Sequence, residues 1–239
     1  MSLSNLIIPE SQRAHKKILK FFRDTPIIQV ICPSSAVLKN FINTIEILLE
    51  EGIRWIQYRG KDTPRKVQYR DCLTVRELTL KYDAMFIVND YIDLALATGA
   101  DGVHLGQEDI PLELAKKIFP QGIIGISTHS LDEALSARSG GADYIGYGPV
   151  FHTVTKDAGT PKGPQSIKEI KRYVKIPLIA IGGIKAENVI SVLEHGADGV
   201  AVSSGIIEGD IKNNVRSFLK GIKEFRDARD NYREKNLYI

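Results

Sequence analysis

Cysteine is scarce in this chain of 239 residues, which contains only Cys32 and Cys72. Neither residue belongs to a Cys-x-x-Cys pair, so the sequence offers no cysteine cluster for a structural zinc site or an iron–sulfur centre. Two isolated cysteines are typical of reduced thiols in a cytoplasmic protein. The sequence therefore argues against a secreted domain held together by disulfide bonds.

Long apolar runs and a one-sided charge are lacking as well. No stretch approaches the roughly 20 apolar residues of a membrane-spanning helix, and residues 1–24 contain no apolar core of signal-peptide length. The 32 basic and 29 acidic residues give a net charge of +3, which is too balanced to indicate a nucleic-acid or membrane partner. We expect a cytoplasmic protein whose local basic residues can still bind phosphorylated small molecules.

What the chain does contain is a regular alternation of short apolar runs with amphipathic, charged segments. Each run has about the length of a buried parallel strand. The runs are 27–32, 53–59, 85–90, 102–106, 122–127, 144–149, 176–183 and 199–204. Gly-Ala-Asp precedes three of them, as expected where similar strand and helix units repeat.

Eight strands with about as many helices fit an α/β fold of the (β/α)8 TIM barrel type. An open doubly wound sheet is the alternative, but polar residues follow almost every run, and only a barrel brings all strand ends to one mouth. We expect the barrel, as a single catalytic domain, over residues 27–228. Residues 1–26 are expected to form a helical extension below it, and 229–239 a charged, frayed tail.

Local signals place some helix ends. In 37–52 the spacing of Leu38, Ile42, Ile45 and Leu49 predicts an apolar face toward the core, ending at Gly52. Ser130 stands three residues before Glu133, which is the pattern of a capping box. In the N-terminal extension, a helix over about 10–22 is expected to turn Ile18, Leu19 and Phe22 toward the bottom of the barrel.

Three polar residues alternate at the end of the second run: Gln57, Arg59 and Lys61. Alternate residues of a strand point to one side, so all three share a side with Trp55, which in a barrel is the interior. Two cations two residues apart suit a pyrophosphate group. The alternative is a solvated strand end.

Two carboxylates follow neighbouring runs, Asp90 after the third and Asp109 after the fourth. Adjacent strand ends would bring them together, and facing carboxylates need a proton or a cation between them. Mg²⁺ prefers oxygen ligands and often completes its shell with phosphate. Each aspartate alone could instead cap a helix.

After the fifth run, Ser127 has no evident structural task and could donate to a phosphate, whereas His129 is the type of residue that more often holds structure. The loops after strands seven and eight commonly bind phosphate in such barrels, and here they carry Gly183, Ser203 and Ser204. A plain turn at the Gly-Gly pair remains an alternative. The stretch 147–163 has no hydrophobic period and is either a surface linker or a loop over the ligand.

In combination these residues resemble the thiamine-phosphate synthase (thiamin-phosphate pyrophosphorylase) family over about residues 27–207. The motifs that carry the resemblance are Gln-x-Arg-x-Lys at 57–61, VNDYIDLAL, GADGVHLGQED, GISTHSLDEA, ADYIGYGPVFHTVTK, IPLIAIGGI and GADGVAVSSGI. The resemblance implies a magnesium-dependent transferase. It would couple hydroxymethylpyrimidine diphosphate to hydroxyethylthiazole phosphate, giving thiamine monophosphate and pyrophosphate.

The resemblance also implies roles, all of them expectations. Catalytic roles would fall to Arg59, Lys61, Ser127 and Lys156, and the Mg²⁺ ligands would be Asp90 and Asp109. The substrate-binding set would comprise Gln57, Tyr58, Arg59, Gly60, Lys61, Asn89, Ser127, Thr153, Val154, Thr155, Lys156, Gly183, Ser203 and Ser204. Within it, Gln57 would hold the pyrimidine, and Thr153, Thr155, Gly183 and both serines the thiazole phosphate. Pyrophosphate would leave before the new bond forms.

Two other functions remain open at this stage. A thiazole tautomerase shares the barrel but makes no C–N bond and lacks the full diphosphate and metal set. A non-catalytic phosphate-binding barrel would use the aspartates only as caps. The family also makes a homo-oligomer plausible. The tyrosine and glycine at 58 and 60 depart from the family's usual aliphatic and glutamate residues, and the N-terminal extension is longer than usual.

Overall fold

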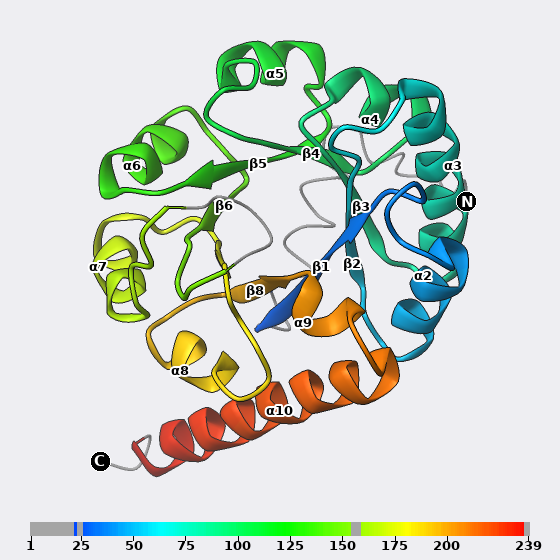
Figure 1. Cartoon of the computed structure of the whole chain (residues 1–239). Coiled ribbons are helices and arrows are strands. Elements are labelled where there is room, and N and C mark those ends of the chain that lie inside the picture. Colours follow the sequence, from blue (N-terminus) through cyan, green and yellow to red (C-terminus); the bar gives the residue numbers. More distant parts are fainter. Residues whose placement is uncertain (1–21, 23–25, 154–158, 237–239) are drawn as a thin grey trace, which may run out of the picture.

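The computed structural model describes residues 22, 26–153 and 159–236, the last four of these without their side chains. Eight parallel strands close into one barrel in chain order (Figure 1). The strands are β1 Ile27–Pro33, β2 Trp55–Arg59, β3 Met85–Asn89, β4 Gly102–Leu105, β5 Ile123–Thr128, β6 Tyr144–Tyr147, β7 Leu178–Ile181 and β8 Gly199–Val202. β1 pairs with both β2 and β8. The predicted TIM barrel is confirmed, and the open sheet is wrong.

Helices surround the barrel on its outside, and α10 lies along α2, α8 and α9 (Figure 1). The helices are α2 Phe41–Glu50, α3 Arg65–Lys81, α4 Ile92–Thr98, α5 Leu112–Ile118, α6 Leu131–Ser139, α7 Gln165–Tyr173, α8 Val189–Glu194, α9 Ser204–Ile207 and α10 Ile211–Asn236. No helix in the described part of the chain is both long and apolar enough to cross a membrane.

The alternation of side chains along the strands separates two cores. On β2, Ile56 and Tyr58 belong to the large core between strands and helices, whereas Trp55 belongs to a small cluster inside the barrel. β3 repeats the pattern, with Phe86 outside and Met85 inside. The inner cluster fills the barrel below its mouth, so polar residues of inward parity higher on the strands face the cavity above it.

Two expectations about helices need adjustment. Ile42 was expected in the core, but it is 52% exposed, because α2 begins only at Phe41, after Asn40 in the left-handed conformation. Phe41, Ile45 and Leu48 therefore carry the buried face. At α6 the hydroxyl of Ser130 accepts from the N–H of Glu133, as the capping box requires.

The two ends of the chain were assigned to an extension and a tail. Phe22 packs edge-on against Trp55, with ring centroids 5.9 Å apart, and so it contacts the inner cluster from below. Ile18 and Leu19 lie outside the described residues. At the other end α10 continues to Asn236, which is helical further into the range 229–239 than a frayed tail would be.

Candidate functional site

A cavity of about 390 Å³ opens at the carboxyl ends of the strands. It is the place where a TIM barrel carries its binding residues. Six residues of the predicted set line it: Arg59, Ser127, Thr153, Gly183, Ser203 and Ser204. The structure thus brings together residues that are up to 145 positions apart, counted from 59 to 204.

A chain of side-chain amides crosses the barrel interior beneath this cavity. Gln29 of β1 donates through Nε2 to Oε1 of Gln57 at 2.8 Å, and Gln57 donates to Oδ1 of Asn89 at 2.7 Å. Asn89 in turn donates to a carboxylate oxygen of Asp90. Gln57 is buried and does not line the cavity, so these bonds hold its amide in place and, through Asn89, orient the carboxylate.

A second polar chain leads to Ser127. The Oγ of Ser127 lies 2.9 Å from Nε2 of His104, whose Nδ1 is 2.9 Å from the hydroxyl of Tyr144. Ser127 was expected to have no structural partner, and this expectation is wrong. Its hydroxyl is held at the cavity wall by a buried histidine. The hydroxyl of Tyr144 also lies 3.5 Å from Nε2 of Gln29, which joins the two chains.

Neither predicted aspartate caps a helix. The residue before α4 is Tyr91 and the residue before α5 is Pro111. Asp90 instead has a φ of 67°, in the left-handed region that few residues other than glycine and asparagine adopt. Asp109 accepts the N–H of Gly106 through Oδ2 at 2.6 Å. The capping alternative is wrong for both.

The two carboxylates act on each other. Burial above all, and then the neighbouring Asp109 carboxyl, raise the pKa of Asp90 from its ordinary value of 3.8 to about 6. The hydrogen bond from Asn89 and the charge of Arg59 partly counter that rise. The second of the two carboxylates loses its proton less readily than a free aspartate, and a cation bound between them would remove this repulsion.

The pair offers oxygen ligands, the kind that Mg²⁺ prefers in proteins. In the described part of the chain, no group of three or more histidine, cysteine, aspartate or glutamate side chains is placed to hold a metal ion. Mg²⁺ needs no such cage, because one or two carboxylates with phosphate and water complete its shell. Asp90 and Asp109 are the residues that could hold it.

The predicted binding residues at the end of β2 lie in different places. Arg59 lines the cavity, and Lys61 lies exposed in the turn two residues later, outside the cavity wall. Tyr58 points the other way and donates its hydroxyl to Asp71 at 2.9 Å. A Cβ at Gly60 would lie 2.7 Å from that hydroxyl oxygen. Both positions therefore pack on the helix side of the strand, and the assignment of Tyr58 and Gly60 to the substrate stays a prediction.

The Gly-Gly pair after β7 is more than a plain turn. Gly182 and Gly183 have φ values of 98° and 61°. A Cβ at Gly183 would lie only 2.3 Å from the carbonyl oxygen of His152. Glycine is required here because two backbone segments meet without room for a side chain. The segment that approaches Gly183 so closely is the one after β6.

That segment belongs to the stretch 147–163, whose two ends are fixed to the barrel. The N–H of Val150 donates to Ile181 at 2.9 Å, and the N–H of Gly163 returns to the carbonyl of Val150 at 3.0 Å. His129, which also lines the cavity, lies 2.8 Å from the carbonyl of Gly148 through Nδ1. A slack linker would lack these bonds. Val154, Thr155 and Lys156 lie outside the described residues.

The residues that follow β8 are Ser203 and Ser204. Ser203 donates its hydroxyl to the carbonyl of Ile31 at 2.9 Å, which ties β8 to β1 at the mouth. Ser204 begins the short helix α9. Both residues line the cavity together with Gly183. This wall therefore presents mainly backbone and hydroxyl groups, with Lys185 as its cation.

Sequence reasoning missed several residues of the site. Lys185 and His152 line the cavity, and Gln29, His104 and Tyr144 form the polar chains below it. A signal for Gln29 was present, because it is a polar residue of inward parity within an otherwise apolar run. Lys185 follows the Gly-Gly pair closely enough that its proximity to an anion site could have been inferred.

Comparisons with known proteins agree with this geometry. A sequence model of the family described as thiamine monophosphate synthase matches residues 28–206. A thiamine-phosphate synthase of Caldicellulosiruptor saccharolyticus is 45% identical over 187 residues, which is 77% of this chain and 85% of that protein. One from Methanosarcina barkeri is 41% identical over 83% of this chain and 91% of that protein. The structure of a thiamine phosphate pyrophosphorylase from Pyrococcus furiosus has a TM-score of 0.77 at 42% identity, covering 83% and 96% of the two chains.

Proposed function

The chain belongs to the thiamine monophosphate synthase family, and we propose that it couples its two substrates in the cavity at the barrel mouth. Hydroxymethylpyrimidine diphosphate and hydroxyethylthiazole phosphate give thiamine monophosphate and pyrophosphate. The C–O bond to the diphosphate breaks and a C–N bond to the thiazole nitrogen forms, with the electron pair of the broken bond leaving on pyrophosphate.

One observation carries this assignment: a single cavity is lined by Arg59 and Ser127 and also by Gly183, Ser203 and Ser204. The first pair supplies a cation and a hydroxyl held by His104. The three others supply backbone and hydroxyl groups where barrels commonly bind phosphate. Two phosphorylated substrates need two such regions within reach of each other.

The substrate roles divide along the same line. The diphosphate falls to Arg59, Lys61, Asn89, Ser127 and Lys156, and the thiazole phosphate to Thr153, Thr155, Gly183, Ser203 and Ser204, with Val154 between those threonines. Gln57 stays beneath the pyrimidine, where its bonds to Gln29 and Asn89 keep its amide fixed. Tyr58 and Gly60 would contribute backbone groups only, because Tyr58 turns its side chain toward Asp71.

Asp90 and Asp109 would hold Mg²⁺, which would neutralise charge on the diphosphate when bound. The side chains of Arg59, Lys61 and Lys156 stabilise the negative charge that grows on the departing pyrophosphate. The pyrimidinyl methyl group is then left as a cation, and the thiazole nitrogen traps it. No nucleophilic side chain is needed, so the chemistry depends on charge placement.

Exclusion of water is the other requirement, because water would capture the pyrimidinyl cation before the thiazole does. The stretch 147–163 enters and leaves beside the cavity wall at Val150 and Gly163, and Thr153 lines the cavity. We assign this stretch to covering the bound substrates. Cys32 and Cys72 are buried and unpaired, in keeping with a proposed cytoplasmic location.

The direct test mixes both substrates with and without Mg²⁺ and follows pyrophosphate and thiamine monophosphate together. We expect both products in equal amounts and only with the metal. A tautomerase would change the thiazole phosphate without releasing pyrophosphate, and a binding barrel would leave both substrates intact. Either of these results would refute the proposal.

The covering stretch has its own test. Lys156→Ala is expected to slow pyrophosphate departure, measured in single-turnover experiments, more than it weakens binding of the thiazole phosphate. The opposite order of effects would move Lys156 from the diphosphate to the other phosphate.

A further inference from the structure

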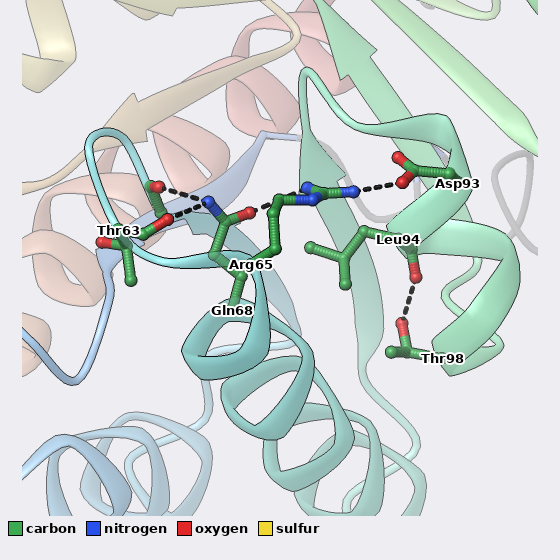
Figure 2. Close-up of polar contacts among 7 residues, drawn as sticks. Thr63, Arg65, Gln68, Asp93, Leu94 and Thr98 are labelled. Atoms are coloured by element: carbon green, nitrogen blue, oxygen red, sulfur yellow. Dashed lines mark hydrogen bonds and ion pairs between the residues drawn. The ribbon is translucent and has the colours of Figure 1, made fainter.

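Gln68 of α3 is a buried polar residue outside the cavity, with only 2% of its surface exposed. Its Nε2 donates to the carbonyl oxygens of Gly60 at 3.0 Å and Thr63 at 2.7 Å. Its Oε1 accepts from Nη1 of Arg65 at 3.0 Å. Figure 2 shows this amide lying between the turn at Thr63 and the Arg65 guanidinium. Both donor positions of the amide and its oxygen are thereby used.

The turn that Gln68 holds is the one that follows β2, with Arg59 just before it and Lys61 within it. The same turn is fixed from inside by Thr63, whose Oγ1 donates to the carbonyl of Lys61 at 3.2 Å and lies 2.7 Å from Oγ of the buried Ser34. The carbonyls of residues 60, 61 and 63 therefore all have side-chain partners. A turn held this way sets the direction of the side chains that leave it.

Through Arg65, Gln68 is also connected to the residues that follow β3. A second nitrogen of the Arg65 guanidinium bonds Asp93 at the start of α4 (Figure 2), and the guanidinium carbon lies 4.3 Å from the centre of the Tyr91 ring. Tyr91 directly follows Asp90. One buried amide thus connects the turn that carries the cations to the turn that carries a carboxylate.

The packing around Gly60 leaves this turn little freedom. A Cβ at Gly60 would lie 2.7 Å from the Tyr58 hydroxyl oxygen and 3.0 Å from Cγ of Gln68. The backbone at Gly60 is therefore enclosed by the two side chains, and Gln68 also bonds its carbonyl. Burying an amide is unfavourable unless its hydrogen bonds are made, so this glutamine is stable only with the turn in place.

We propose that Gln68 is a positioning residue for the diphosphate substrate. It makes no contact with the substrate and acts by holding the turn of Arg59 and Lys61 in register with Asp90. The inference rests on the proposed function, because it needs an anionic leaving group bound between these residues. It predicts that loss of the Gln68 amide affects one substrate and not the other.

The test compares Gln68→Met, which keeps length but removes the donor, with wild type and with Thr79→Val. Thr79 is a matched control, because it is equally buried on α3 and its hydroxyl donates only within that helix. Gln68→Met should raise KM for the pyrimidine diphosphate about tenfold, the cost of roughly one net hydrogen bond. KM for the thiazole phosphate should stay within about twofold, as should both constants in Thr79→Val.

Two readouts do not depend on turnover. Amide hydrogen exchange over residues 60–63 should accelerate in Gln68→Met and not in Thr79→Val, since the carbonyls of Gly60 and Thr63 lose their donor. Affinity for pyrophosphate with Mg²⁺, measured by calorimetry, should fall about tenfold. Should Gln68→Met fail to fold, Arg65→Met removes the partner of Oε1 from a side chain 46% exposed, and the same constants should shift about threefold.

The outcomes separate the two proposals. If wild type releases no pyrophosphate from the two substrates, the proposed function fails, whatever Gln68 does to the exchange of the turn. If wild type is active but Gln68→Met raises both KM values equally, or leaves exchange and pyrophosphate affinity unchanged, the positioning role is wrong.

Discussion

The two sides of the barrel mouth are built from different parts. From β1 to β5, polar side chains form the site: amides, the hydroxyl of Tyr144 from β6 and a histidine connect Asp90 to Ser127 through the barrel interior. From β6 to β8, the backbone forms it, with glycines at 182 and 183 where no side chain fits. We therefore expect substitutions that remove a charge to impair the side from β1 to β5, the side-chain half. Adding a single carbon at a glycine should impair the side from β6 to β8, the backbone half.

The largest effect is expected on the side-chain half. Asp109→Asn should lower kcat at least about 100-fold, because an amide is a poor magnesium ligand and charge stabilisation is worth that much. The substitute keeps an oxygen for the N–H of Gly106, so the free energy of unfolding should change by less than about 1 kcal/mol. Steady-state kinetics and denaturant unfolding measure the two quantities.

The matched control is Glu108→Gln, which removes the charge of the exposed carboxylate next to it. Its kcat should stay within about twofold. If Asp109→Asn keeps activity within about tenfold of wild type, the metal role of this side of the mouth is wrong.

The backbone half is tested by Gly183→Ala. The added carbon would meet the carbonyl of His152 at 2.3 Å, and the φ of 61° is unfavourable for alanine. We expect KM for the thiazole phosphate to rise about tenfold while KM for the diphosphate stays nearly constant, and the unfolding free energy to fall by about 2–3 kcal/mol.

Gly209→Ala separates the two causes, because Gly209 has a φ of 75° with no atom within 4 Å of the added carbon. It should cost only the conformational term, about 1 kcal/mol, and leave KM unchanged. Equal losses of stability in the two variants would show that the contact with His152 is unimportant.

The carboxylate pair gives a pH dependence in the metal-free protein. Burial, and after it the neighbouring Asp109 carboxyl, raise the pKa of Asp90 from 3.8 to about 6, so the folded state binds this proton more tightly than the unfolded state. The stability that it contributes is therefore present below about pH 4 and lost as the pH rises through about 6. Asp90→Asn should remove this loss, as measured by unfolding at several pH values without Mg²⁺.

The contrasting outcome is as informative. The difference in unfolding free energy between wild type and Asp90→Asn could instead stay constant from pH 4 to pH 7. In that case the two carboxylates do not repel each other. The side-chain half would then lack the feature that favours a cation.

The barrel could be predicted from the sequence because its signals are local and repeated. Each strand is a short apolar run, and parity along β2 correctly turned Trp55, Gln57 and Arg59 inward. Where parity was not applied, the direction of the side chain was not predicted: Tyr58 was included in the binding set, but it is adjacent to two inward residues and its side chain faces the helices. Ile42 failed for a related reason, because the phase of α2 depends on where the helix begins.

The site was only partly predictable, because its bonds join residues far apart in the chain. Nothing near Ser127 in sequence reveals that His104 holds its hydroxyl, and nothing near Gly60 reveals that Gln68 bonds its carbonyl. Likewise, the sequence shows a Gly-Gly pair after β7 but not what it contacts. The partner, the carbonyl of His152, is visible only once the strands are closed into a barrel.

The smallest effect on activity is expected from Tyr58→Phe, which sharpens the boundary of the side-chain half. The tyrosine hydroxyl donates to Asp71, which also accepts the N–H of Ser35 at 2.9 Å. Its loss should lower the unfolding free energy by about 1–3 kcal/mol, since a buried carboxylate loses a partner. Both KM values and kcat should stay within about twofold, because the ring still packs beside Gly60. A selective rise in KM for the pyrimidine diphosphate would return Tyr58 to the substrate and extend the side-chain half beyond the barrel wall.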